Sequence, residues 1–99
     1  MFALIVRFKA IKGKEKDMEH ILRKVIEKVR QNEKDTLFYD MHRKIDDPTE
    51  IVFYERYTNR DAWEVTHCSK PYIKGLLGEL ADHMECEIQV TEYELVEAK

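Results

Sequence analysis

Two spacings of apolar residues divide the first part of the chain into a strand and a helix. In residues 2–10 apolar side chains occupy every second position, which predicts a β-strand. Over residues 14–32 the spacing becomes helical, with Lys and Glu on the other face, and this predicts an amphipathic helix. Its apolar positions are Met18, Ile21, Leu22, Val25 and Val29.

Two strands joined by a turn follow this helix. The pattern predicts strands over residues 36–45 and 50–58, the first with Leu37, Tyr39 and Met41 on one face. The intervening Asp46-Asp47-Pro48-Thr49 has the residue types of a turn. We therefore expect residues 36–58 to form a hairpin.

A broken helix and a last strand complete the chain. Thr58 or Asn59 can cap a helix that stops near residue 68, because Pro71 fits only in the first turn of a new helix. A second helical piece and a strand over residues 86–96 follow. The order β-α-β-β-α-β predicts an α+β fold, an antiparallel sheet with its helices on one face, and the length leaves room for one domain.

One face of such a sheet has no helix to cover it. The predicted first and third strands are apolar on both parities, as in Ile51-Val52-Phe53-Tyr54. An exposed apolar face of that size usually marks a partner surface. We therefore expect a two-fold homodimer, sheet against sheet.

Composition and charge exclude several classes of partner. Charged residues make up 37% of the chain with both signs mixed and a net charge of −3, whereas a nucleic-acid-binding face is basic. No segment approaches the ~20 apolar residues of a membrane span, and we expect no signal peptide, because residues 1–8 lack a basic region, an apolar region and a cleavage site in sequence. Cys68 and Cys86 are expected to be reduced thiols. We expect a cytoplasmic protein that binds neither nucleic acid nor membrane.

The most informative stretch joins the third strand to the next helix, from Glu55 to His67. Trp63 and His67 lie four residues apart, hence on one helix face. Because histidine titrates near neutral pH, His67 could act as a general base in a cleft between helix and sheet, with the Trp63 indole as a flat wall. The alternative is a histidine kept for packing.

Glu55 shares a strand face with Tyr57 and apolar residues, so its carboxylate needs a partner. An ion pair with Arg7 or Arg43 would satisfy it. The alternative is that Glu55 orients His67 or a substrate hydroxyl.

No cofactor or metal motif accompanies these residues. His20, His42 and His83 are scattered, and the chain has no glycine-rich phosphate loop, nucleophile elbow or dinucleotide fingerprint. We expect an enzyme of this kind to work without a cofactor or a fixed metal.

The residues from Glu55 to Tyr72 form the pattern Glu55-x-Tyr57-x-Asn59-x-x-Ala62-Trp63-x-x-x-His67-x-Ser69-x-Pro71-Tyr72. This pattern resembles the signature of the antibiotic biosynthesis monooxygenase (ABM) domain. The similarity extends upstream to Lys12-Gly13-Lys14-Glu15, Thr36-Leu37-x-Tyr39-x-x-x-Arg43 and Asp47-Pro48. Where many members have glycine before the Thr-Leu pair, this chain has Asp35, which tolerates left-handed backbone better than most residues.

The resemblance implies a ferredoxin-like fold that dimerises through its sheets into an α/β barrel, with a cleft between sheet and helices in each subunit. Members include cofactor-independent oxygenases of quinols and polyketide phenols, and others degrade haem or isomerise small signalling molecules. Family membership alone therefore does not fix the function. The haem-degrading branch pairs an Asn on the first strand with Trp and a more distant His, a set that this chain lacks.

The resulting hypothesis is a cofactor-independent monooxygenase that acts on a quinol or other electron-rich aromatic with dioxygen. His67 is the expected base and Glu55 the orienting carboxylate. Two alternatives remain: an isomerase of a small hydroxy-carbonyl compound, which a polar pocket would favour, and a dimeric binding or stress-associated module, which a filled pocket would favour. The residues expected to bind substrate are Trp63, Tyr57, Tyr72 and Asn59.

Overall fold

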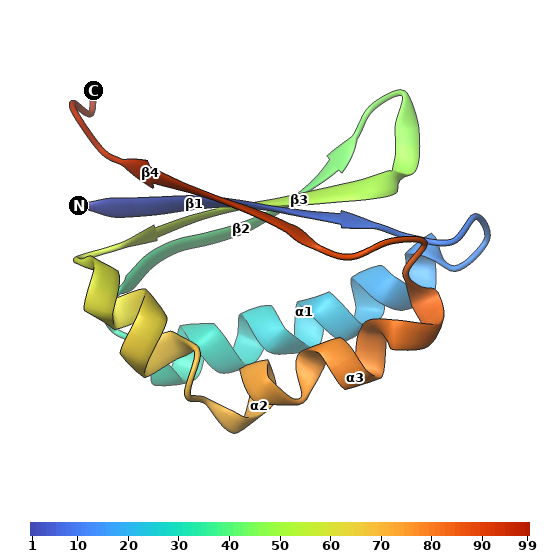
Figure 1. Cartoon of the computed structure of the whole chain (residues 1–99), viewed down its shortest axis with the longest axis horizontal. Coiled ribbons are helices and arrows are strands. Elements are labelled where there is room, and N and C mark those ends of the chain that lie inside the picture. Colours follow the sequence, from blue (N-terminus) through green and yellow to red (C-terminus); the bar gives the residue numbers. More distant parts are fainter.

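The computed structural model describes residues 1–99 and shows a four-stranded antiparallel sheet with all helices on one side (Figure 1). The strand order is β2-β3-β1-β4, the ferredoxin-like α+β arrangement that the sequence predicts. The elements in chain order are β1 (Phe2–Lys9), α1 (Glu15–Asn32), β2 (Thr36–Lys44), β3 (Asp47–Tyr57), the π-helix η1 (Ala62–His67), α2 (Pro71–Lys74), α3 (Leu76–Leu80), the 3₁₀-helix η2 (Ala81–His83) and β4 (Gln89–Glu94).

Helix α1 forms a long cover over the sheet. Gly13, with a φ of 95°, makes the turn out of β1, and its N–H donates to the Glu15 carboxylate at 3.0 Å. Burying each large apolar side chain of the helix contributes roughly 1.5–3 kcal/mol relative to leaving it exposed. The predicted apolar stripe does face the core, with Met18, Leu22, Val25 and Val29 buried.

The two faces of the sheet differ in what covers them. Alternate residues of β1 and β3 point toward the helices, and the antiparallel register pairs Val6 with Phe53 and Leu4 with Glu55. The opposite face carries no helix (Figure 1). The inward-facing residues that are fully or almost fully buried are Leu4, Val6, Phe8, Ile51, Phe53, Glu55 and Tyr57.

A β-bulge at the start of β2 changes one expected inward position. The register with β3 shifts between Thr36 and Phe38, so Leu37 is the extra residue. Leu37 is 40% exposed, whereas Tyr39 and Met41 pack against the core as expected. Alternation alone therefore predicts the wrong environment for Leu37.

The turn before β2 forms without the left-handed residue that the family resemblance suggested. No residue other than glycine has a positive φ, so Asp35 does not adopt that conformation. Its carbonyl instead accepts a hydrogen bond from the Thr58 N–H at 3.1 Å. This bond ties the start of β2 to the end of β3.

The segment after β3 begins and ends as predicted but is not an α-helix throughout. Asn59 acts as the cap, because its Oδ1 accepts a hydrogen bond from the Ala62 N–H at 2.9 Å. The Cys68 N–H then bonds the Trp63 carbonyl, five residues back, at 2.9 Å, which is the π-helical pattern. Pro71 starts the next helix, as expected.

Some element boundaries differ from the prediction. The hairpin is tighter than expected, since β3 starts at Asp47 and pairs Asp47 with Lys44. The last strand is shorter than residues 86–96. No helix combines the length and the apolar composition that a membrane crossing requires.

Replacing Gly78 with alanine should stabilise the protein by about 0.5–1 kcal/mol, because glycine loses more backbone freedom on folding. Gly78 is exposed within α3, and a Cβ built there meets no atom within 4 Å. The matched change at Gly13 should destabilise by about 1 kcal/mol, because its φ of 95° strains any L-residue. Equilibrium urea unfolding measures both free energies, and shifts in the same direction would contradict the opposite signs expected for the two positions.

Candidate active site

An apolar cavity of about 180 Å³ lies between the helix side of the sheet and the segments η1, α2 and α3. Its size is comparable to the roughly 150 Å³ engineered cavity that binds benzene. Ten of the twelve lining residues are hydrophobic, and the polar exceptions are Glu55 and His67. The apolar walls include Tyr39, Trp63, Ile73, Leu76, Leu77, Ile88 and Val90.

The cavity adjoins a wider apolar groove of about 490 Å³ beside α3, η2 and the segment that precedes β4. Leu77 and Ile88 line both hollows. Leu77 is 52% exposed, so the groove provides an approach to the cavity from solvent.

His67 and Trp63 reach the cavity from η1. The wider π-helical turn keeps both side chains on the cavity side, although the sequence suggested an α-helix. His67 is only 3% exposed, and its ring packs against the rings of Tyr39 and Tyr57 at centroid distances of 5.3 Å and 5.5 Å. Its Nδ1 lies 2.7 Å from Oε1 of Glu33, and its Nε2 has no hydrogen-bond partner within the protein.

Glu33, directly after α1, is the principal site residue that was not predicted from the sequence. Thr36 Oγ1 donates to its Oε1 at 2.7 Å, the Tyr72 hydroxyl donates to its Oε2, and His67 bonds Oε1. Burial raises the pKa of Glu33, but hydrogen bonds from His67, Tyr72 and Thr36 outweigh it, so the net pKa lies below its ordinary value. An ionised Glu33 accepts a hydrogen bond from Nδ1–H of His67, so in the neutral imidazole Nε2 is the nitrogen that can accept a proton.

A signal for Glu33 does exist in the sequence. Leu22, Val25 and Val29 form the buried stripe of α1, and the next position of that stripe, four residues after Val29, is Glu33. A carboxylate at a core position needs buried donors. The surrounding run of charged residues hides this pattern, because such runs normally face solvent.

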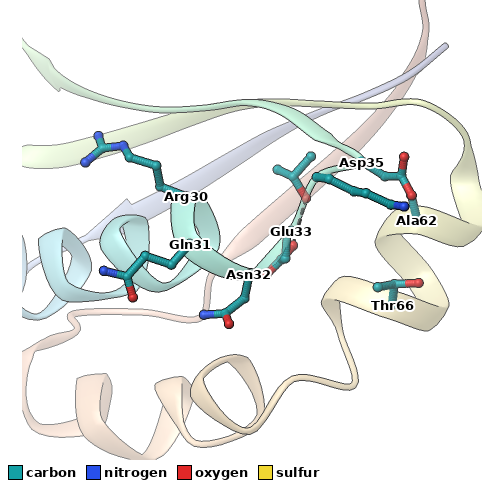
Figure 2. A pocket seen from close by; sticks show the side chains of 9 residues that line it. Arg30, Gln31, Asn32, Glu33, Asp35, Ala62 and Thr66 are labelled. Carbon is teal, nitrogen blue, oxygen red and sulfur yellow. Dashed lines mark hydrogen bonds between the residues drawn. The ribbon is translucent and has the colours of Figure 1, made fainter.

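A polar surface pocket of about 340 Å³ lies on the other side of Glu33. Figure 2 shows Asn32 at the end of α1 on one side, Ala62 and Thr66 of η1 on the other, and Glu33 between them. The dashed line in this figure is the bond between Glu33 and Thr36. Glu33 therefore stands between this polar pocket and His67, which lines the apolar cavity.

Glu55 is buried without the expected arginine. Arg7 pairs with Glu50 at 2.7 Å and Arg43 with Glu19 at 2.6 Å, so neither reaches Glu55. The Tyr57 hydroxyl donates to Oε1 of Glu55 at 2.7 Å. Burial raises the pKa of Glu55 to about 7, against the opposing effects of Tyr57 and His67. Burial therefore favours the neutral form of the Glu55 carboxyl.

The other predicted site residues have different places. Trp63 forms a wall, stacked on Phe2 at a centroid distance of 5.4 Å, with the Arg60 guanidinium 5.9 Å from its ring. Tyr57 and Tyr72 do not line the cavity, because their hydroxyls are bonded to the two buried carboxylates. Asn59 caps η1. Of the predicted residues, the cavity brings together His67, Glu55 and Trp63.

Cys68 contributes an apolar wall. Burial raises the pKa of its thiol, which keeps it protonated, and both cysteines are free. No group of three or more His, Cys, Asp or Glu side chains is arranged to hold a metal ion.

The sequence profile of the antibiotic biosynthesis monooxygenase family matches residues 1–75. The chain belongs to this family. No curated protein matches the sequence.

Solved structures show the same fold as this ABM domain. One is a Nitrosomonas europaea protein that carries the family name, with a TM-score of 0.89 at 23% identity, covering 98% of this chain and 100% of that one. A Caulobacter crescentus protein with the same family name has a TM-score of 0.90 at 21% identity, covering 97% of this chain and 90% of that one. At these identities the likeness shows the fold.

Replacing Glu55 with Gln should remove a pH-dependent loss of stability from the ABM domain. The pKa of Glu55 in the folded protein, about 7, lies above its ordinary value of 4.5. The stabilisation that protonated Glu55 contributes is therefore fully present below pH 4.5 and is lost as the pH rises through about 7. Between pH 4.5 and 8 the wild type should lose about 3 kcal/mol relative to Glu55→Gln. Urea unfolding across this range measures the difference.

Glu79→Gln is the matched control, because Glu79 is exposed on α3. Its stability should follow the wild type at every pH. If the curve for Glu55→Gln also runs parallel to the wild type, Glu55 does not titrate abnormally.

Proposed function

We propose that this protein is a cofactor-independent monooxygenase that acts on a quinol or another electron-rich aromatic. The observation that carries the proposal is an apolar, aromatic-walled cavity lined by one imidazole. One nitrogen of this imidazole has no partner in the protein, and the other binds a buried carboxylate. A deprotonated phenol or quinol can transfer an electron to dioxygen itself. The protein then has to supply a base and a site that excludes water.

In this proposal His67 is the base and Glu33 positions it. Nε2 accepts the proton of a substrate hydroxyl, and the carboxylate 2.7 Å from Nδ1 stabilises the imidazolium that results. Trp63 and Tyr39 supply flat walls for an aromatic ring. In this proposal Tyr57, Tyr72 and Asn59 do not contact substrate, and their hydrogen bonds hold the site residues in place.

The cavity favours this function over the two alternatives. An isomerase of a small hydroxy-carbonyl compound would favour a polar pocket, whereas ten of the twelve lining residues here are hydrophobic. A module without catalysis would favour a filled pocket with His67 fully bonded. Here the cavity has about 180 Å³ of space, and Nε2 of His67 is free.

Removing the base should abolish most of the activity. Purified protein should take up oxygen with a dihydroxybenzene or dihydroxynaphthalene, and His67→Ala should lower the rate by about 10²–10⁴-fold, because general-base catalysis contributes that much. An oxygen electrode measures the rate. His20→Ala, at an exposed position on α1, is the control and should retain the wild-type rate. Equal rates for His67→Ala and wild type would eliminate His67 as the base.

We further propose that the protein is a homodimer formed through the uncovered face of the sheet. Apolar and aromatic side chains on that face support this, including Phe38 and Tyr93, which are 41% and 51% exposed. Ile5, Val52 and Tyr54 are half-buried beside them. Burying such a face removes apolar surface from water, which is the main driving force for association.

A charge on this face should dissociate the dimer. Light scattering of the wild type should give twice the chain mass of 11.9 kDa, and Val52→Lys should give a single chain, because an unpaired charge would be buried in the contact. Val65→Lys is the control, since Val65 is 62% exposed on η1, on the helix side. A monomeric wild type would contradict the proposed dimer.

A further inference from the structure

The cavity contains two polar atoms that the protein leaves without partners. Nε2 of His67 and Oε2 of Glu55 form no hydrogen bond, although each residue is only 3% exposed. Among buried side-chain nitrogen and oxygen atoms that have no contact with solvent, only Nδ1 of His83 lacks a hydrogen-bond partner, so the two atoms named above do not belong to that group. The free atoms of Glu55 and His67 therefore have access to open space, and the space that both residues line is the cavity.

These two atoms come from neighbouring side chains. The Tyr57 ring packs against His67 at a centroid distance of 5.5 Å, while its hydroxyl bonds Glu55 at 2.7 Å. Tyr39 is the cross-strand partner of Glu55, and its ring lies 5.3 Å from that of His67. A ligand in the cavity can therefore meet both residues.

The surroundings of the two residues give them opposite proton roles. The Glu33 carboxylate accepts from Nδ1–H of His67, so in the neutral imidazole Nε2 is the acceptor. Glu55 has one hydroxyl donor, no arginine or lysine partner, and apolar neighbours, which favour its neutral form. A neutral carboxyl is a donor, so the cavity holds an acid and a base.

We propose that Glu55 is the general acid that cleaves the oxygen–oxygen bond in this reaction, and that the substrate is a quinol with a hydrogen on the ring carbon next to a hydroxyl. This inference rests on the proposed function. It adds a second catalytic residue and restricts the substrate to quinols that carry a hydrogen on that ring carbon.

The proton and electron transfers balance in three steps. His67 removes the hydroxyl proton, the quinol anion reduces dioxygen and forms a carbon–oxygen bond, and protonated His67 returns the proton to give a ring hydroperoxide. His67 then takes the proton from the carbon that carries the hydroperoxide, and the C–H electrons form a carbonyl as the oxygen–oxygen bond breaks. Glu55 gives its proton to the departing hydroxide. The overall reaction is quinol plus dioxygen giving hydroxyquinone plus water. A proton then passes from His67 to Glu55, which returns both residues to their starting protonation states.

The decisive variant is Glu55→Gln, because glutamine keeps the size and the bond from Tyr57 but delivers no proton. Its turnover number should fall about 100-fold, as expected for loss of a general acid. The trapped hydroperoxide should then eliminate hydrogen peroxide and leave a quinone. The overall reaction of the variant is quinol plus dioxygen giving quinone plus hydrogen peroxide. Hydrogen peroxide released per dioxygen consumed should rise from near zero in the wild type to near one.

Two measurements separate this role from simple binding or misfolding. Trp63 is the only tryptophan and lines the cavity, so benzoquinone that binds there should quench its fluorescence. The dissociation constants of benzoquinone from the wild type and from Glu55→Gln should agree within about threefold. Infrared spectra at pH 6 should show the C=O stretch of a neutral carboxylic acid in the wild type that is missing from Glu55→Gln. Glu79→Gln should retain the wild-type product ratio and this band.

The possible failures are distinguishable. If Glu55→Gln makes hydroxyquinone at the wild-type rate without hydrogen peroxide, or if the carboxylic acid band is the same in both proteins, Glu55 is not the acid. If the wild type consumes no oxygen with any such quinol, the proposed function is overturned and the Glu55 step with it.

Discussion

The buried carboxylate of Glu33 is the interaction on which the site depends. It accepts hydrogen bonds from the start of β2 through Thr36, from the end of η1 through His67 and from α2 through Tyr72. Leaving a buried partner unsatisfied costs about 1–3 kcal/mol, and more when a charge is involved. Two parts of the chain that are distant in sequence, residues 33–36 and 67–72, therefore meet at one side chain, and the orientation of His67 follows from the packing of α1.

Two buried carboxyl groups within one site behave oppositely because Glu55 is the more deeply buried and receives fewer hydrogen-bond donors. Glu33 has three donors, and its pKa lies below the ordinary value. Glu55 has one, and burial raises its pKa to about 7. Environments that separate the pKa values of paired groups are how a protein obtains an acid and a base at one pH. Tyr57 and Tyr72 are important for this reason, although neither contacts the cavity.

The sequence predicts the fold better than it predicts the site. Alternation and helical spacing are local properties of the sequence. The order of elements, the inward stripe of α1 and the break before Pro71 could therefore all be predicted from it. The bulge at Leu37 and the π-helical bond from Cys68 to Trp63 depend on hydrogen-bond register, which periodicity does not encode. Glu33 has a weak signal that its charged neighbours hide, and Glu55 lacked its expected arginine because Arg7 and Arg43 have other partners.

The family profile ends at residue 75, and this boundary divides the cavity. The groups proposed to transfer protons or to position them, Glu33, Glu55 and His67, lie within the matched part. Several walls lie beyond it, namely Leu76, Leu77, Ile88 and Val90. Substitutions in α3 and at the start of β4 can therefore reshape the space for a ligand while the proton chemistry stays intact. In this architecture selectivity can evolve separately from reactivity, which is one way for a single small fold to acquire many substrates.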